Sequence, residues 1–540
     1  MKIKLLFSVM IVVFATIFTG CKDEKDNDVS LAGITLSKTS VTLKPEITET
    51  LSCTFFPDNA ANKNVTWSSS NTAVATVDNK GQVTAVGVGT AQITVTSSQD
   101  ASLKATCDVT VAWDQLNNVS GNVSGVWEKN TVVNVSGHIS VPKGSSLTIE
   151  EGVQVIFDDN GVGASHTKIE FMVAGNLYCK GTTTNPVLFS VAPGKRTSAN
   201  IFAGLWGGIV GTSDCGEMLF DHVIIEYTGA PVVADSPSAV AGIYTAGDDA
   251  APQITTNNVN GKYVLINSEL RYGASDATYF MGGNVIVANN LFHANGYTGA
   301  EAVNVKAGCK ADVAFNVMYS PNTNGLKLSS SGQDDTAGRF QAQIKAYNNT
   351  IINAGWRRDG EKGGSAYIEK AALVSIFNNL IVNCKFKAMT PKWGTVSISD
   401  GCDTNSVIDY NFYASGSQQS TLPQDIAGGT ITSFLGYTKS NKNVYPQYVD
   451  VNSFVSALAG DAAKDPKFVN YPFNTDPLTS YTYNSSWDLH VQSGSPVLTG
   501  AYNGSDAKMT PLFSSTGVTV GGTAYKTPAP ANRFGAYGTN

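Results

Sequence analysis

The densest group of side chains suited to carbohydrate chemistry lies about two thirds of the way along the 540-residue chain. Aromatic rings there could stack on a sugar, and cationic side chains could pair with a carboxylate. The residues concerned are Trp356 and Tyr367 among the aromatics, and Arg357, Arg358 and Lys370 among the cations. Trp393 adds a further ring for stacking, so these positions predict a carbohydrate-binding surface.

A second interpretation of the same loop stays open. Asp359 and Glu361 accompany the two arginines, and mixed charges of this kind are typical of a solvated loop that keeps an elongated protein soluble. Further charges lie in the stretches 269–272 and 301–306, which could share a face with the loop if the stacking register brings them together.

The sequence predicts no metal centre and no nucleophile elbow. Seven cysteines follow Cys21 without a CxxC pair, which argues against a thiolate zinc site. The acidic pairs at 158–159, 248–249 and 334–335 are interpreted as turns, and loops of this kind could bind calcium weakly. None of them has the spacing of an EF-hand. His293 is interpreted as a residue at a strand edge rather than a base, and no Gly-x-Ser-x-Gly motif supports a serine nucleophile.

The elements that would position these residues are short strands that end in asparagine. The repeated residues are Asn290, Asn316, Asn349, Asn379 and Asn411, at steps of 26, 33, 30 and 32 residues. Such a repeat, without a helical period, predicts a β-solenoid. Asparagine tolerates left-handed backbone angles at a corner, and its amide can bond to the asparagine one coil away. We therefore predict a structural ladder at this corner.

Residues 31–111 show the period-two alternation and glycine-bounded turns of a β-sandwich. The order Val65-Thr66-Trp67, Ala75-Thr76-Val77 and Gly81-Gln82-Val83 closely resembles the bacterial Ig-like family of group 2. The resemblance implies a spacer or adhesive module with Trp67 as its core aromatic. Cys53 and Cys107 fall on the inward side of their strands, either as a disulfide or as two buried thiols. Residues 112–130 are expected to be a linker.

The region 131–540 resembles right-handed parallel β-helix proteins of the pectate-lyase type. The segments that carry the resemblance are 137–141 and 147–153 as first coils, 206–209 in the middle, and 465–469, 489–496 and 534–537 as the closing coil. Lyases of this type act on uronic-acid polymers with a cation, often Ca²⁺, and a Lys or Arg base. The resemblance thus implies Arg357, Arg358 and Lys370 as catalytic residues if the protein is a lyase, although they match no lyase active-site motif one by one.

The first twenty residues have the basic start and apolar run of a secretory signal peptide, too short to span a membrane. Phe18-Thr19-Gly20-Cys21 resembles a bacterial lipobox, which implies that Cys21 carries lipid. The charged stretch that follows makes residues 21–30 a flexible tether. It also resembles the sorting signal of Bacteroidetes lipoproteins, which implies an outer-membrane protein that faces the exterior.

Composition narrows the function classes. Only 15% of residues are charged, and 43 acidic against 36 basic side chains leave a net charge of -7, which excludes a nucleic-acid binder. We predict an all-β protein with an Ig-like β-sandwich followed by a right-handed parallel β-helix. The predicted function is a surface lipoprotein whose partner is an extracellular polysaccharide or host glycan. The alternatives are a polysaccharide lyase that acts by β-elimination and an adhesin that binds protein.

Overall fold

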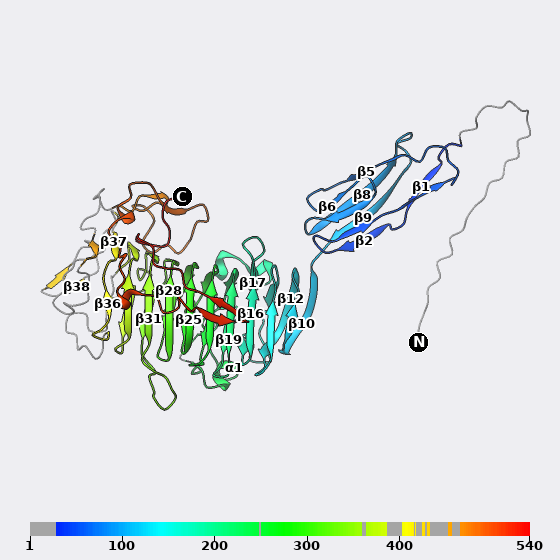
Figure 1. Cartoon of the computed structure of the whole chain (residues 1–540). Helices are drawn as coiled ribbons and strands as arrows, with labels where there is room; N and C mark the ends of the chain where they lie inside the picture. The colour runs from blue at the N-terminus through cyan, green and yellow to red at the C-terminus, as the bar shows by residue number, and fades with distance from the viewer. Residues whose placement is uncertain are drawn as a thin grey trace, which may run out of the picture. The chain divides into compact units, whose positions relative to one another are not determined.

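The computed structural model divides the chain into two units, residues 1–113 and 114–540 (Figure 1). It describes residues 29–247, 250–358, 363–385, 402–414, 416, 424–426, 429–431, 452–455 and 465–540. Helical structure in these residues is limited to α1 (Pro237–Val240) and the short 3₁₀ turns Pro193–Lys195, Ser198–Asn200, Pro496–Leu498 and Ala507–Met509. None of the described helices has the length and apolar character needed to cross a membrane.

The first unit is the predicted β-sandwich. Its strands are β1 (Gly33–Leu36), β2 (Ser40–Leu43), β3 (Thr48–Thr50), β4 (Cys53–Phe56), β5 (Val65–Ser69), β6 (Ala75–Val77), β7 (Gln82–Ala85), β8 (Gly89–Ser97) and β9 (Lys104–Val111). Alternate residues of β8 and β9 are buried, as the period of two requires. Trp67 is half-buried against this core, while Cys53 and Cys107 are free thiols, which settles the open alternative between thiols and a disulfide.

The second unit is a solenoid whose coils each contribute strands to three faces. The first face is a 10-stranded parallel sheet, and the other two faces share a 19-stranded sheet. The strands of the first face are β11 (Gly125–Trp127), β13 (Ser146–Ile149), β16 (Asn176–Lys180), β19 (Glu217–Asp221), β22 (Lys262–Ile266), β25 (Gly283–Ala288), β28 (Cys309–Ala314), β31 (Gln343–Tyr347), β34 (Leu373–Phe377) and β36 (Val407–Ile408).

The second and third faces follow in each coil. The second face holds β14 (Gln154–Phe157), β17 (Val187–Val191), β20 (Val223–Glu226), β23 (Glu269–Gly273), β26 (Leu291–Asn295), β29 (Val317–Tyr319), β32 (Thr350–Ile352), β35 (Leu380–Val382), β37 (Phe412–Ala414) and β40 (Phe454–Val455). The third face holds β15 (Phe171–Val173), β18 (Ile209–Gly211), β21 (Ile254–Thr256), β24 (Thr278–Phe280), β27 (Val303–Val305), β30 (Asn324–Ser329) and β33 (Gly364–Glu369). The predicted fold class, an Ig-like sandwich followed by a right-handed parallel β-helix, is confirmed.

The expected linker at 112–130 is wrong. β10 (Asp114–Asn122) pairs in parallel with β12 (Thr131–Val141), and β11 pairs with β13, so the solenoid already begins at residue 114. The side chains of β10 are mostly polar and exposed, so the sequence of this strand shows no apolar alternation that would predict it. An end coil needs no apolar outer side, because only its inner side meets a neighbour.

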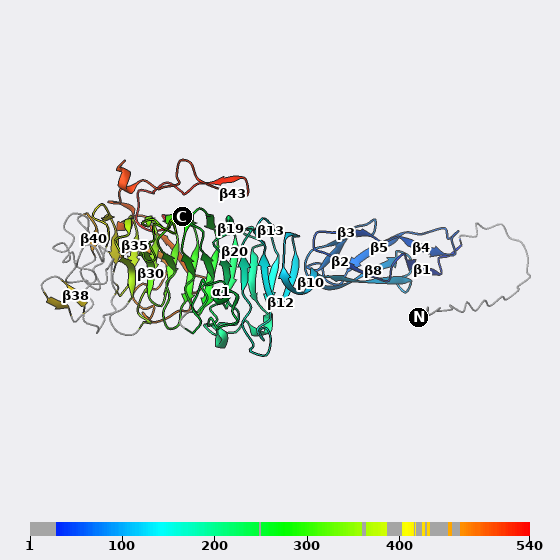
Figure 2. The same cartoon turned by 90° about the horizontal axis from the view of Figure 1, so that it is seen from below.

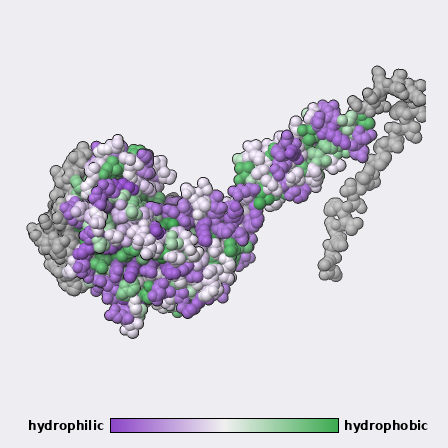
Figure 3. Space-filling view, viewed as in Figure 1, coloured by the Kyte–Doolittle hydropathy of each residue, from purple (hydrophilic) through white to green (hydrophobic). Residues whose placement is uncertain are grey.

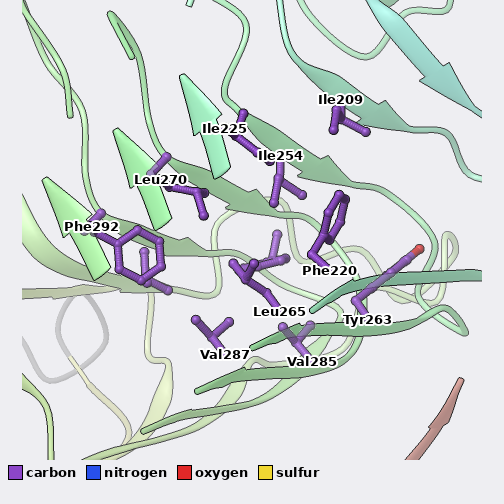
Figure 4. Packing of buried hydrophobic residues seen from close by; sticks show 14 of the residues in the cluster. Ile209, Phe220, Ile225, Ile254, Tyr263, Leu265, Leu270, Val285, Val287 and Phe292 are labelled. Carbon is purple, nitrogen blue, oxygen red and sulfur yellow. The ribbon is translucent and has the colours of Figure 1, made fainter. Parts of the chain in front are cut away.

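One continuous core fills the inside of the solenoid. Figure 4 shows side chains of successive coils meeting there, with Phe220, Leu265 and Val287 from the first face near Leu270 and Phe292 from the second. All of these side chains are buried. Alternate residues of each strand point into this core, and in many strands the outward residues are buried as well, because other parts of the chain cover them.

The predicted asparagine ladder is present at the corner between the first and second faces. The Nδ2 atom of each asparagine donates to the Oδ1 atom of the next, at 2.9–3.0 Å, from Asn290 through Asn316, Asn349 and Asn379 to Asn411. The backbone N–H groups of the first four also donate to the same Oδ1 atoms. Each Nδ2 bonds in addition to a carbonyl of the preceding coil, such as Val313 for Asn349.

The left-handed backbone angle lies one residue before each ladder asparagine. Asn289, Asn348 and Asn378 adopt φ of 59°, 50° and 57°, and Phe315 and Tyr410 take the same conformation in the other two coils. We predicted that each ladder asparagine would both adopt the left-handed angle and form the ladder bond. Two successive residues perform these roles instead: the first turns the chain and points outward, and the second forms the ladder bond.

The end of the chain does not form the predicted closing coil. β41 (Phe468–Asn470) and β42 (Asp488–Val491) are antiparallel, and their segment packs on the outside of the second face through a cluster that includes Phe412, Phe473 and Phe534. The hairpin of β43 (Val518–Val520) and β44 (Thr523–Tyr525) covers the outside of the first face, as Figure 2 shows. A further hairpin joins β38 (Gln424–Ile426) and β39 (Gly429–Ile431).

Substitution of Asn349 by alanine tests the ladder. The change leaves the backbone N–H of Asn316 and the carbonyl of Val313 without this partner and removes one of the two bonds to Asn379, so we expect unfolding free energy to fall by about 3 kcal/mol. Urea denaturation followed by far-ultraviolet circular dichroism measures the loss. The exposed Asn260→Ala serves as the control, with an expected change within about 0.5 kcal/mol. Equal stability of the two variants would contradict a structural ladder.

Candidate functional site

The outer side of the third face carries a row of polar and aromatic residues. The strand register places Tyr279 of β24, Asn304 of β27, Lys327 of β30 and Tyr367 of β33 beside one another on successive coils. Neighbouring strands lie about 4.8 Å apart, so the row spans roughly the length of a short oligosaccharide. Alternate residues such as Val305 and Leu328 point into the core, so the row lies on the outer side of the face, with Tyr279, Lys327 and Tyr367 half-buried and Asn304 buried.

A pocket of about 380 Å³ opens beside this row. Its walls come from three coils: the corner before β27, the strand β30 with the residue before it, and the corner and strand around β33. The lining residues are Gly299, Ala300, Glu301, Thr323, Asn324, Lys327, Arg358, Gly363, Tyr367 and Glu369. The pocket thus combines two carboxyl groups, two cations, one aromatic ring and several hydrogen-bonding groups.

A pair of buried carboxyl groups forms one wall. The backbone N–H of Glu301 donates to Oδ1 of Asp276 at 2.7 Å, and Nδ2 of Asn304 donates to Oδ2 of Asp276 at 2.9 Å. Nδ2 of Asn324 donates to Oε1 of Glu301 at 3.1 Å. Burial, followed by the charge of Asp276, raises the pKa of Glu301 well above its usual value.

Two lysines and a third carboxyl group lie at the other end of the row. The Nζ atoms of Lys306 and Lys327 each lie 3.9 Å from Oε1 of Glu369, which also accepts a hydrogen bond from Ser329. Lys306 sits 5.2 Å from the ring centre of Tyr279, and Lys327 lies 5.9 Å from that of Tyr367. Burial lowers the pKa of Lys306, with the nearby charge of Lys327 as a second cause.

Several buried polar atoms around the pocket have no hydrogen-bond partner in the described part of the chain. They are Oδ1 of Asn304, Oδ1 of Asn324 and Oγ1 of Thr323. Asn304 and Asn324 are each only 2% exposed, so burial of these oxygens without a partner is unfavourable. An amide oxygen left open beside a pocket is suited to a hydroxyl donor on a ligand.

The structure brings together only part of the predicted surface. Tyr367 and Arg358 line the pocket, and so do Glu301 of the stretch 301–306 and Glu369. The backbone carbonyl of Arg358 accepts a hydrogen bond from the buried Lys385, which fixes the position of this part of the loop.

Arg357 does not reach the pocket. Its guanidinium is buried and donates at 2.8 Å to the backbone carbonyls of Asn295, Gly296 and Ser320, and it lies over the rings of Phe202 and Tyr481. Burial lowers the pKa of Arg357 to about 10. A side chain that joins three carbonyls is a structural clamp, and Arg357 is not among the residues that line the pocket, so its catalytic role stays a prediction.

The remaining predicted residues lie elsewhere. The indole of Trp356 is half-buried and donates to the carbonyl of Asn383, which turns the ring away from a role as an open stacking platform. Lys370 is exposed in the turn after β33, at a φ of 58°, and is not among the lining residues. Trp393 and residues 359–362 lie outside the described residues.

The stretch 269–272 belongs to the second face and to a different charge network. Arg271 pairs at 2.7 Å with both Glu226 and Glu269, and Nε2 of His293 lies 2.8 Å from Glu269. Burial opposes ionisation of Glu269, but the bond from His293 and the charge of Arg271 outweigh it and lower the pKa to about 2. His293 is thus a buried partner in this network, and the expected shared face is wrong.

Sequence reasoning missed four residues of the site and its wall, Asp276, Asn304, Asn324 and Lys327. They lie on short third-face strands whose corners vary in length, so their alignment depends on a register that no repeated residue marks. The signal that could have found them is the alternation in 324–329, where Lys327 interrupts an apolar run.

The Ca²⁺ that a lyase of the resembled type would use finds no matching ligand set. Among the described residues, no group of three or more His, Cys, Asp or Glu side chains could hold a metal ion. Asp276 already accepts two hydrogen bonds, and Glu369 faces two lysines. The donors of the pocket therefore do not fit a calcium site.

Comparison with known proteins identifies the first unit only. Residues 30–109 match the bacterial Ig-like domain (group 2), which confirms that part of the resemblance. An uncharacterized protein of Clostridium acetobutylicum is 46% identical over 87 residues, 16% of this chain and 9% of the relative. A 3-O-alpha-D-galactosyl-alpha-L-arabinofuranosidase of Bifidobacterium longum is 41% identical over 98 residues, 17% of this chain and 9% of the enzyme. A lacto-N-biosidase of Bifidobacterium bifidum is 38% identical over 82 residues, 15% and 7% of the two chains.

These matches fall in the Ig-like region and cover about a tenth of the curated relatives' own length. The relatives therefore share the module with this chain, and their printed activities belong to their remaining parts or to the whole enzymes.

Replacement of Arg357 by alanine tests the structural interpretation of this residue. Three buried carbonyls lose their donor, so we expect unfolding free energy to fall by about 3 kcal/mol. Chemical denaturation of the purified protein measures the change. The matched control is Arg358→Ala, at the adjacent half-buried residue that lines the pocket. This change should lower the unfolding free energy by less than about 1 kcal/mol. The opposite order would show that Arg358, not Arg357, supports the loop.

Proposed function

We propose that the third face of the solenoid binds an extracellular polysaccharide or host glycan. The observation that carries the proposal is the aligned row of Tyr279, Asn304, Lys327 and Tyr367 with a pocket beside it. A glycan that lies along the row would meet aromatic rings about three coil spacings apart, and polar groups between them.

The chemistry of the pocket favours a sugar that bears a negative charge. Lys327 and Arg358 supply positive charge at the wall, and burial beside Asp276 raises the pKa of Glu301, which disfavours a negative charge on this carboxyl. The open oxygens of Asn324 and Thr323 accept from sugar hydroxyls. Together these groups suit a uronate or another acidic sugar.

The relatives support a glycan partner at a coarse level. Two of the proteins that share the Ig-like module are an arabinofuranosidase and a lacto-N-biosidase, whose names describe action on glycans. In this chain we assign the module the role of a spacer.

The proposal includes a lipid anchor. Residues 1–28 lie outside the described residues, and the sequence pattern around Cys21 supports cleavage of a signal peptide and lipidation of this cysteine. A tether and the Ig-like module would then hold the solenoid outside the outer membrane. This is the arrangement that a surface glycan-binding lipoprotein requires.

Two other functions receive less support. A polysaccharide lyase needs a base, and Lys306, whose pKa is lowered by burial, would take that role rather than Lys370. A protein-binding adhesin would need a continuous apolar surface. On the face that Figure 3 shows, hydrophobic residues are scattered among hydrophilic ones.

Two variants test glycan binding directly. Tyr367→Ala removes a ring from the row and Lys327→Ala removes a charge, so we expect each to weaken binding about tenfold or more. Affinity gel electrophoresis of residues 29–540 through polygalacturonate, alginate, hyaluronan, chondroitin sulfate and neutral arabinan measures retention.

The matched controls keep one property of each site residue. Tyr367→Phe preserves the ring and should preserve retention, and Lys310→Ala removes an exposed lysine of the first face and should have no effect. Retention that is the same in all four variants would rule out the third face. A lyase would reveal itself in the same samples by new ultraviolet absorbance.

Substitution of Cys21 tests the anchor. Wild-type protein should incorporate labelled fatty acid in its bacterial host and remain with the membrane fraction, because acyl chains bury many methylene groups in the bilayer. Cys21→Ser should lose both properties. Cys53→Ser in the Ig-like module is the control and should keep them, whereas labelling that survives Cys21→Ser would place the lipid elsewhere.

A further inference from the structure

We propose that the pocket cleaves its glycan by hydrolysis, with Glu301 as the proton donor and Glu369 as the base that activates water. The inference rests on the proposed glycan binding and adds a catalytic function to it. It starts from the two carboxyl groups that line one pocket in opposite surroundings. A proton donor and a proton acceptor within one carbohydrate site are the two groups that glycoside hydrolysis requires.

Glu301 is built into the pocket wall beside a second carboxyl group, that of Asp276. Its side chain is 7% exposed, its Oε1 accepts a hydrogen bond from Asn324, and Asp276 lies directly behind it. The carboxylate of Asp276 is held by the Glu301 backbone N–H and by Asn304, so its charge faces the acid from a fixed position. These contacts leave Glu301 as the group that meets the ligand.

Glu369 has the surroundings of an ionised carboxylate. Two lysines lie 3.9 Å from its Oε1, and the hydroxyl of Ser329 donates to the same atom at 3.0 Å. Glu369 aligns with Ser329 at the ends of β33 and β30, whereas Glu301 contacts Asn324 at the start of β30. The two carboxyl groups therefore flank the row near opposite ends of β30, and both line the same pocket.

The unpartnered oxygens provide an independent sign of a ligand. Asn324 lines the pocket, is 2% exposed and has no partner for its Oδ1 within the described residues. A buried amide oxygen without a partner, on a residue that lines a pocket, is satisfied by a hydroxyl of a bound sugar. The proposed acid Glu301, the proposed base Glu369 and the amide of Asn324 thus line the same pocket.

The reaction balances with water as the only co-reactant. The proton of Glu301 passes to the glycosidic oxygen as the bond between this oxygen and the anomeric carbon breaks. A water oxygen forms a bond to the same carbon from the opposite side, and the water proton passes to Glu369. A proton then returns from Glu369 to Glu301 through solvent. Displacement by water from the side opposite the leaving group inverts the configuration at the anomeric carbon.

Hydrolysis is tested on each polysaccharide of the panel that the protein retains, in water enriched in ¹⁸O. We expect new reducing ends that carry ¹⁸O, an inverted anomer by nuclear magnetic resonance, and no unsaturated product. Glu301→Gln and Glu369→Gln should each reduce the rate about 100-fold or more while retention persists. Glu150→Gln, outside the pocket, is the matched control and should keep the full rate.

The outcomes separate this inference from glycan binding. A polysaccharide that is retained without new reducing ends, or that yields unsaturated ends without ¹⁸O, overturns hydrolysis and leaves binding intact. Full activity in Glu301→Gln overturns the assignment of the acid. Absence of retention by every polysaccharide of the panel would overturn the proposed function and the hydrolysis with it.

The pH profile tests Asp276 as a positioning residue. The acid must be protonated, so the rate falls as pH rises through the pKa of Glu301, and the charge of Asp276 helps to raise that pKa. Asp276→Asn should therefore move the fall in rate to lower pH, with the rate at low pH largely kept. A loss of rate that is equal at every pH would indicate a merely structural role for Asp276.

Discussion

The solenoid depends on how its buried corner satisfies backbone and amide groups that no strand can reach. At the corner between the first and second faces, the chain turns within two residues, and its N–H and C=O groups lie inside the protein. A buried polar group without a partner is costly. Each ladder asparagine bonds to the coils on both sides, so every coil closes at the same place and in the same register.

A fixed corner on one edge leaves the other two edges free to vary. The loops 296–302 and 353–363 join the second face to the third, and 330–342 joins the third face to the first. All three border the third face, where two of them supply walls of the pocket. The rigid ladder thus permits long insertions at the opposite edges without loss of register, which is where functional side chains commonly lie.

Charge alone does not distinguish the site from the scaffold. The network of Glu226, Glu269, Arg271 and His293 is as densely charged as the pocket, yet every ionised group in it faces an opposite partner. Around the pocket, by contrast, Glu301 stands beside another carboxyl group, and the oxygen of Asn324 is open. Carboxyl groups in unequal surroundings and polar atoms without a hydrogen-bond partner mark the places where a ligand can form hydrogen bonds that the protein does not.

The sequence alone determined the fold class, the Ig-like module and the ladder, because each is a local or periodic pattern. Asn290 through Asn411 recur at every coil, and the alternation of β8 and β9 is visible within single strands. Only the tertiary structure decided which charged residues meet. Arg357 and Arg358 are neighbours in sequence, but one clamps backbone carbonyls and the other lines the pocket. Asp276, Glu301 and Glu369 come together because corners of unequal length bring separate coils into register, and a sequence does not encode that alignment in any repeated residue.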